Sequence, residues 1–320
     1  MKIGMIAKKK YLQPLSVDEA LSMTEGLDND FRFLAGGTDL MVNRFHGNEN
    51  SSCLVDLGVI SELKEVKTAD GYLSIGSLVK LSDIRNYPEI AREFPVLMEA
   101  AHAVGSPVVR RTATLGGNIL CENRCIFYNQ SEWWRDAVGF CLKCEGNICI
   151  ATGSKKHCYS EFVSDTAPAL ISLDAMIEVV GKEGERRIKL EEIYTGEGVH
   201  PRSLDRNVII KSILLPLDQG FRSVFYKLRQ RASMEFTSLT TVVTLHKSGK
   251  LKIVLGGVDP KPVVVEGGRD SDREELIKQA LKKSRAIDNE MLSRNYRRAM
   301  IRVLLKRSFD AVIGAASANR

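Results

Sequence analysis

Six of the seven cysteines of this 320-residue chain lie in one short stretch, between Cys121 and Cys158. The same stretch holds both tryptophans and shows little helical or strand periodicity. A loop of about 40 residues without secondary structure is uncommon inside a compact domain. We therefore expect bound metal to supply the order that a hydrophobic core does not supply there.

The spacing of the thiols leaves several ligand sets open. Cys141 and Cys144 form a Cys-x-x-Cys pair, and three residues separate Cys121 from Cys125. Four cysteines suit a 4Fe–4S cluster, whereas four cysteines, or cysteines with His157, suit structural zinc. Only one Cys-x-x-Cys pair is present, so the irregular spacing favours an iron–sulfur cluster. Free buried thiols and disulfides are the remaining alternatives, and a reducing compartment disfavours disulfides.

The composition is that of an ordinary globular chain, with 44% hydrophobic and 27% charged residues, and the length suits two or three domains. No apolar run approaches the roughly 18–20 residues of a membrane span. The start of the chain lacks an apolar signal region, so we expect a cytoplasmic protein. Much of the net charge of +6 lies near the C-terminus, which predicts a solvated helix face or a docking surface. Nucleic acid is not an expected partner, because no binding motif accompanies these basic residues.

Periodicity predicts alternating helices and strands. Ser16 is expected to cap a helix, with Glu19 at the capping-box position. Cys53 is expected in the core of a strand, and Ser248-Gly249 is expected to join two strands of a hairpin. Two helices, about 271–287 and 289–316, are expected to close the chain.

Two glycine pairs follow apolar runs, Gly36-Gly37 in FLAGGTDL and Gly116-Gly117 in TATLGGNI. Glycines let backbone N–H groups approach phosphate oxygens, and Thr38 and Thr114 can add hydroxyl donors. Neither loop matches the dinucleotide-binding or P-loop motif. A tight turn is the alternative interpretation of each pair.

Several segments occur along the chain in the order FLAGGTDLM, YLSIGSLV, ATLGGNI, SDTAPALISLDA, YKLRQRAS, LGGV and SRNYRRAM. Together they resemble the FAD-binding medium subunits of the xanthine oxidase family of molybdenum hydroxylases, over essentially the whole chain. Within that family, the cysteine insertion and its NQSEWWR segment are similar to those of 4-hydroxybenzoyl-CoA reductase β subunits, which carry a 4Fe–4S cluster besides FAD.

The resemblance implies an α+β fold. A FAD-binding domain of the PCMH, or vanillyl-alcohol oxidase, type would occupy residues 1–215. It would comprise two α/β subdomains, about 1–57 and 58–215, with the iron–sulfur insertion at about 121–160. An α+β C-terminal domain of the CO dehydrogenase flavoprotein type would occupy residues 216–320.

The resemblance also implies where FAD binds. One loop would wrap the pyrophosphate, and its residues are Ala35, Gly36, Gly37, Thr38, Asp39 and Leu40. A second loop would contact phosphate and ribityl atoms, through Thr114, Gly117 and Asn118. Asp165 would contact nearby polar atoms of FAD, and Ile210 and Lys227 would lie near the isoalloxazine ring.

Among the six clustered thiols, the resemblance selects four as cluster ligands, namely Cys125, Cys141, Cys149 and Cys158. Cys121 would be a core residue, and Cys144 has no clear role. Trp133 and Trp134 are expected to shield the cluster or to pack the insertion on its domain.

The implied function is electron transfer within a molybdenum enzyme that removes the para-hydroxyl group of 4-hydroxybenzoyl-CoA to yield benzoyl-CoA. Electrons from ferredoxin would enter through the 4Fe–4S cluster and pass to FAD. They would continue through two 2Fe–2S clusters on a small subunit to molybdenum on a large molybdopterin-binding subunit. The expected assembly is a heterohexamer of two heterotrimers, with no catalytic acid or base on this chain.

Two alternatives remain open. One is the FAD subunit of another molybdenum hydroxylase, which oxidises an N-heterocycle or an aldehyde. The other is a zinc-stabilised interaction module without a redox role.

Overall fold

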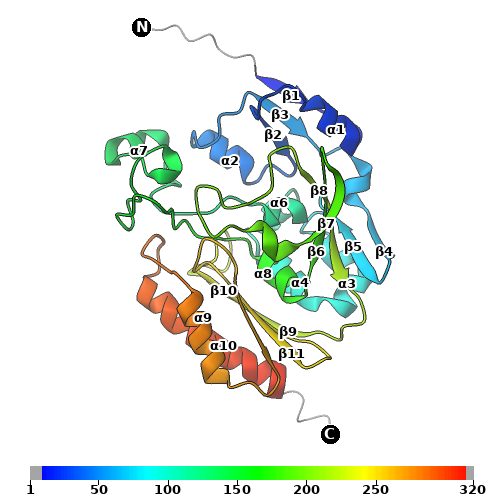
Figure 1. The fold of residues 1–320 in the computed structure, drawn as a ribbon, viewed down its shortest axis with the longest axis vertical. Helices are drawn as coiled ribbons and strands as arrows, with labels where there is room; N and C mark the ends of the chain where they lie inside the picture. The colour runs from blue at the N-terminus through cyan, green and yellow to red at the C-terminus, as the bar shows by residue number, and fades with distance from the viewer. Residues whose placement is uncertain (1–8, 315–320) are drawn as a thin grey trace.

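The computed structural model describes residues 9–314, which build three sheets, each with its own hydrophobic core (Figure 1). The three sheets follow one another along the long axis of the molecule, from the N-terminal strands to the C-terminal helices (Figure 1). The mixed helix and strand content agrees with the expected α+β class.

The N-terminal unit is a small parallel sheet with strand order β1-β3-β2. Its elements are β1 Lys10–Leu12, α1 Val17–Met23, β2 Phe31–Leu34, α2 Leu40–Phe45 and β3 Cys53–Asp56. The predicted N-cap is confirmed, because Ser16 Oγ accepts the Glu19 N–H at 3.1 Å. Glu19 Oε2 accepts the N–H of Leu15, one residue before the cap, at 2.6 Å, so the capping box is formed only in part. Cys53 is fully buried on β3, as expected.

The middle unit is an antiparallel sheet with strand order β4-β5-β8-β6-β7. Its strands are β4 Val66–Ala69, β5 Tyr72–Gly76, β6 Met176–Gly181, β7 Gly184–Lys189 and β8 Ile209–Pro216. Its helices are α3 Pro88–Glu93, α4 Pro95–Ala103, α5 Pro107–Arg110, α6 Leu115–Ile119 and α8 Thr166–Ser172. Pro88 and Pro95 each occupy the first helical position, where the missing N–H costs no hydrogen bond.

The C-terminal unit is an antiparallel meander with strand order β12-β11-β10-β9, and α9 and α10 pack on one face of it. Its elements are β9 Arg222–Leu228, β10 Leu239–Leu245, β11 Lys250–Gly256, β12 Val263–Gly268, α9 Arg273–Lys283 and α10 Arg294–Gly314. Gly249 closes the predicted hairpin with φ +88°, a conformation that favours glycine. Both closing helices are shorter than expected, and residues 315–316 lie outside the described residues.

Helix α8 lies between the middle and C-terminal units. All seven of its residues are buried, and it packs against α4, β10 and β11. Val242 and Val254 of the meander therefore belong to the core of the middle unit. The proposed domain boundaries at residues 57 and 215 stay predictions.

The cysteine segment leaves the middle unit after α6 and returns to it before α8. Arg124 and Glu161 pair as an isolated antiparallel bridge, so the two ends of the segment meet. The segment contains a short helix, α7 Glu132–Val138, that its sequence did not predict, and one 3₁₀ turn, η3 Leu142–Cys144. Helix α7 projects from the body beside α2 (Figure 1). Trp133 on this helix is 78% exposed, so the expectation that it packs or shields the segment is wrong.

Within residues 9–314, no helix is long and apolar enough to cross a bilayer.

Candidate cofactor-binding site

The first glycine loop connects β2 to α2. A Cβ on Gly36 would lie 2.0 Å from the Thr112 carbonyl oxygen, so glycine is required where this loop packs against the second glycine loop. Gly37 has φ +69°. The N–H groups of Gly36, Gly37 and Thr38 donate to no other described residue. Successive free N–H groups form an anion-binding concavity, which fits a phosphate group.

The second glycine loop has a different hydrogen-bonding pattern. Thr114 Oγ1 caps α6 by accepting the Gly117 N–H at 3.1 Å, and Gly116 donates its N–H to the Ser77 carbonyl at 2.8 Å. These N–H groups are therefore satisfied within the chain. Asn118 Oδ1 accepts the hydroxyl of Thr166 at 2.6 Å, which fixes the orientation of the Asn118 amide.

Asp165 and Lys227 form a buried ion pair, with Lys227 Nζ 2.6 Å from Asp165 Oδ2. Lys227 Nζ also donates to the carbonyls of Ala103 and Glu235, so its three donors are used within the chain. Asp165 Oδ1 is buried without a partner among the described residues, which leaves an acceptor for a bound group. Burial raises the pKa of Asp165 to about 6, although Lys227 opposes this shift. Ile210 is buried on β8 in the core of the middle unit.

The first glycine loop is attached to the beginning of the cysteine segment. Asp39 Oδ2 accepts the Glu122 N–H at 2.9 Å, and Asp39 Oδ1 forms an ion pair with Arg124. Asp39 is therefore a structural link between the two regions. The sequence did not predict the roles of Glu122 and Arg124, because their spacing matches no motif.

The four predicted ligand cysteines line one small cavity. Its lining residues are Cys125, Phe127, Tyr128, Cys141, Leu142, Lys143, Cys149, Ile150, Ala151, Cys158, Tyr159, Ser160 and Ile287. Neither Cys121 nor Cys144 is among them. The four thiols that the resemblance selected from six therefore line one cavity.

Local turns aim these thiols inward. The carbonyl of Cys125 accepts the N–H groups of Tyr128 and Asn129, and the carbonyl of Cys149 accepts those of Thr152 and Gly153. A similar turn at Cys141 requires glycine at position 146, where a Cβ would lie 1.8 Å from the Phe140 carbonyl oxygen. Cys158 is placed by its N–H bond to Glu197 Oε1, at 2.9 Å.

The thiol environments differ among the cysteines. Burial raises the pKa of Cys125 and of Cys121 to about 12 each. Interaction with the Cys144 thiol lowers the pKa of Cys141 to about 6, and the same interaction raises the pKa of Cys144. Cys144 therefore lies beside a predicted ligand, as the Cys-x-x-Cys spacing suggested, but it does not line the cavity.

The cavity has room for about one water, at about 10 Å³. Within residues 9–314, no three His, Cys, Asp or Glu side chains are grouped closely enough to hold a single metal ion. A 4Fe–4S cluster takes four cysteine thiolates at wider spacing than a single ion does, so this cavity would have to open to hold one. His157 is exposed and does not line the cavity, which disfavours a zinc site that includes it.

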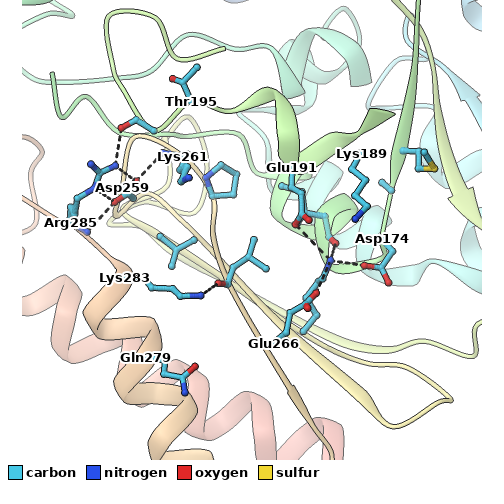
Figure 2. Close-up of a pocket in the computed structure, with 18 of the residues that line it drawn as sticks. Asp174, Lys189, Glu191, Thr195, Asp259, Lys261, Glu266, Gln279, Lys283 and Arg285 are labelled. Atoms are coloured by element: carbon cyan, nitrogen blue, oxygen red, sulfur yellow. Dashed lines mark hydrogen bonds and ion pairs between the residues drawn. The ribbon is translucent and has the colours of Figure 1, made fainter. Parts of the chain in front are cut away.

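A larger cleft of about 1180 Å³ lies between the middle and C-terminal units (Figure 2). Its charges are largely paired with one another. Lys252 Nζ lies 2.5 Å from Asp174 Oδ1 and 3.5 Å from Glu266 Oε1. Arg285 Nε lies 2.8 Å from Asp259 Oδ2 (Figure 2). None of the predicted cofactor or metal residues lines this cleft, so it is separate from the candidate site.

The free N–H groups of the first glycine loop define a protein whose N-terminal unit can bind an anionic group such as a phosphate. Residues 5–218 match the family described as "FAD binding domain in molybdopterin dehydrogenase". The chain belongs to this family.

Relatives with recorded functions support the same assignment. The chain is 31% identical over 244 residues to the aldehyde oxidoreductase FAD-binding subunit PaoB of Escherichia coli K12, covering 73% of this chain and 77% of that subunit. It is 26% identical over 269 residues to the carbon monoxide dehydrogenase medium chain of Hydrogenophaga pseudoflava, covering 81% of this chain and 78% of that medium chain. These relatives are oxidoreductase subunits, and this chain is the FAD subunit of a molybdenum hydroxylase-type enzyme.

Solved structures agree in fold. A chain of reconstituted CO dehydrogenase from Oligotropha carboxidovorans superposes with a TM-score of 0.74 at 19% identity, covering 97% of this chain and 99% of that one. A chain of quinoline 2-oxidoreductase from Pseudomonas putida 86 superposes with a TM-score of 0.71 at 18% identity, covering 99% of this chain and 99% of that one. The expected CO dehydrogenase flavoprotein fold is thereby confirmed.

Proposed function

We propose that this FAD subunit also carries a 4Fe–4S cluster and serves a molybdenum enzyme that reduces 4-hydroxybenzoyl-CoA to benzoyl-CoA. Replacing the aromatic hydroxyl by hydrogen consumes two electrons and two protons and releases water. The observation that carries the proposal is the shared cavity of Cys125, Cys141, Cys149 and Cys158. The cluster is inferred from this chain's own cysteines, since the names of its relatives specify FAD.

For FAD, we propose the contacts that the sequence suggested. Residues 35–40 would hold the pyrophosphate through the free N–H groups of their loop. Thr114, Gly117 and Asn118 would form the opposite wall, where the Asn118 amide is already oriented. The unpaired Oδ1 of Asp165 offers an acceptor, Lys227 keeps that carboxylate in place, and Ile210 belongs to the apolar floor.

For the cluster, the four cysteines would act as thiolate ligands, and the remaining segment would exclude water and position them. The 4Fe–4S cluster would carry one electron at a time, and FAD would carry one or two. The chain's contribution is to hold both sites on one framework, with Asp39 joining them.

We further propose the partners that this function requires. They are a large molybdopterin-binding subunit, a small subunit with two 2Fe–2S clusters, and ferredoxin as the electron donor. A heterohexamer of two heterotrimers in the cytoplasm would assemble these parts. The description of one relative as a medium chain supports the existence of larger and smaller partner chains.

A second candidate is the FAD subunit of an enzyme that oxidises an aldehyde or an N-heterocycle. The similarity to an aldehyde oxidoreductase subunit favours it. Steady-state assays of the assembled complex distinguish the two. We expect turnover of 4-hydroxybenzoyl-CoA with a reduced viologen as donor, and turnover only of aldehydes or heterocycles with an electron acceptor would contradict the proposal.

Cysteine variants test the cluster itself. Cys149→Ser should lose the iron–sulfur signal and retain FAD, whereas Cys53→Ser, a buried strand cysteine far from the cavity lining, should keep both. Loss of iron from Cys121→Ser and Cys144→Ser, with Cys149→Ser unaffected, would show that the ligand assignment is wrong. A zinc-stabilised module would instead contain zinc and lack visible absorption from iron.

A further inference from the structure

Lys143 is a buried cation in the wall of the four-cysteine cavity. It lies in η3 between Cys141 and Cys144, and its side chain is 4% exposed. A lysine ammonium is rarely buried without compensating partners, because it loses its hydration. The burial of Lys143 beside the four cysteines is therefore not explained by their arrangement alone.

The partners of Lys143 hold its ammonium group in one position. Its Nζ lies 2.6 Å from Glu122 Oε1, donates to the Gly198 carbonyl, and sits 5.0 Å from the centre of the Tyr128 ring. The ring face adds a cation–π attraction. The amine is thus held in one place beside the cavity.

Glu122 does not cancel the positive charge, because it is shared by two cations. Arg202 Nη2 lies 3.0 Å from Glu122 Oε2, on the opposite side of the carboxylate from Lys143. Burial raises the pKa of Glu122, but Lys143 and Arg202 outweigh burial and hold the pKa below its usual value. Of these two cations, Lys143 lines the cavity and Arg202 does not. A second carboxylate, Glu197, accepts the N–H groups of Cys158, Val199 and His200.

We propose that Lys143 is a buried counter-charge that raises the reduction potential of the iron–sulfur cluster at this site. The inference rests on the proposed function. Four thiolates concentrate negative charge, and the arrival of one electron from a low-potential one-electron donor adds to it without making or breaking a bond. A fixed cation in a poorly screened interior stabilises the reduced form more than the oxidised form. Lys143 acts as a positioning and tuning residue.

The test is a redox titration of the assembled complex, followed by the electron paramagnetic resonance signal of the reduced cluster. Lys143→Met removes the charge and keeps an unbranched apolar chain, so the midpoint potential should fall. Lys156→Met is the matched control, because Lys156 is exposed in the same segment two residues before Cys158. Because solvent screens an exposed charge, Lys156→Met should shift the midpoint potential clearly less than Lys143→Met does.

Glu122→Gln provides a second variant for the case in which Lys143→Met fails to bind iron. It removes the negative charge beside Lys143, so the midpoint potential should rise. The backbone N–H of residue 122 still donates its hydrogen bond to Asp39. An iron-loaded Lys143→Met complex with an unchanged or raised potential would overturn the inference. An unshifted Glu122→Gln complex would overturn it too. Iron-free wild-type protein would instead refute the proposed function, so the two failures are distinguishable.

Discussion

Asp39 Oδ2 accepts a hydrogen bond from the backbone N–H of Glu122 at 2.9 Å, and this bond connects the first glycine loop to the beginning of the cysteine segment. The other carboxylate oxygen of Asp39 pairs with Arg124. Two regions that are more than eighty residues apart in the sequence therefore share one carboxylate. The proposed flavin and cluster sites are adjacent for this reason.

Asp39→Ala should destabilise the protein by about 1–3 kcal/mol, because it leaves the largely buried Arg124 without its partner. Urea unfolding and flavin content per chain measure the two effects, and both should fall. Asp39→Asn keeps an acceptor for the Glu122 N–H and should lose less of each. Equal behaviour of Asp39→Ala and the wild type would contradict the linking role.

Gly36→Ala should lower flavin content, because the new Cβ would lie 2.0 Å from the Thr112 carbonyl oxygen and push the two glycine loops apart. Gly314→Ala is the matched control, since a Cβ there meets nothing within 4 Å. Flavin absorbance per chain after gel filtration measures the effect. A Gly36→Ala protein with wild-type flavin content would show that the close approach of the loops does not matter for binding.

Arg297→Met should cost about 3–5 kcal/mol of unfolding free energy. Arg297 is 0% exposed and pairs with Glu161, so its loss leaves a buried carboxylate without a partner. Arg302→Met, on the same helix, breaks an exposed pair with Glu274 and should cost about 1 kcal/mol or less. Urea unfolding of both variants provides the comparison, and similar losses would contradict the expected dependence on burial.

Asp165 should make stability depend on pH. Burial raises its folded pKa to about 6 from 3.8, although Lys227 opposes the shift. Between these values the folded chain binds more protons than the unfolded chain. The contribution of Asp165 to stability is therefore largest below about pH 4, falls as pH rises to about 6, and is constant above that.

The measurement is the difference in unfolding free energy between the wild type and Asp165→Asn from pH 4 to pH 7. The wild type should lose up to about 3 kcal/mol relative to the variant across this window. Titrating groups that do not contact Asp165 cancel in the difference. A relative gain of stability with rising pH would mean that Lys227, and not burial, dominates the pKa of Asp165.

Local signals predicted much of the fold. The N-cap at Ser16 and the hairpin at Gly249 are set by neighbouring residues, and both are confirmed. Helix α7 was missed because its two tryptophans and flanking polar residues give no apolar stripe, and Trp133 is exposed. Its position depends on a distant contact, in which Arg135 donates to the His46 carbonyl.

The candidate site could be predicted only in part. The choice of four cysteines came from a resemblance, and the structure places those four around one cavity. Lys143 was overlooked because a lysine in a Cys-Leu-Lys-Cys turn usually faces solvent, and nothing in the sequence pairs it with Glu122. Such long-range ion pairs depend on how the chain folds back on itself.

The central claim, a flavin and an iron–sulfur cluster on one chain, is tested most directly by metal and flavin analysis of anaerobically purified protein. We predict about four irons and one FAD per chain, with broad visible absorption that bleaches on reduction. FAD with stoichiometric zinc and no iron would contradict the claim.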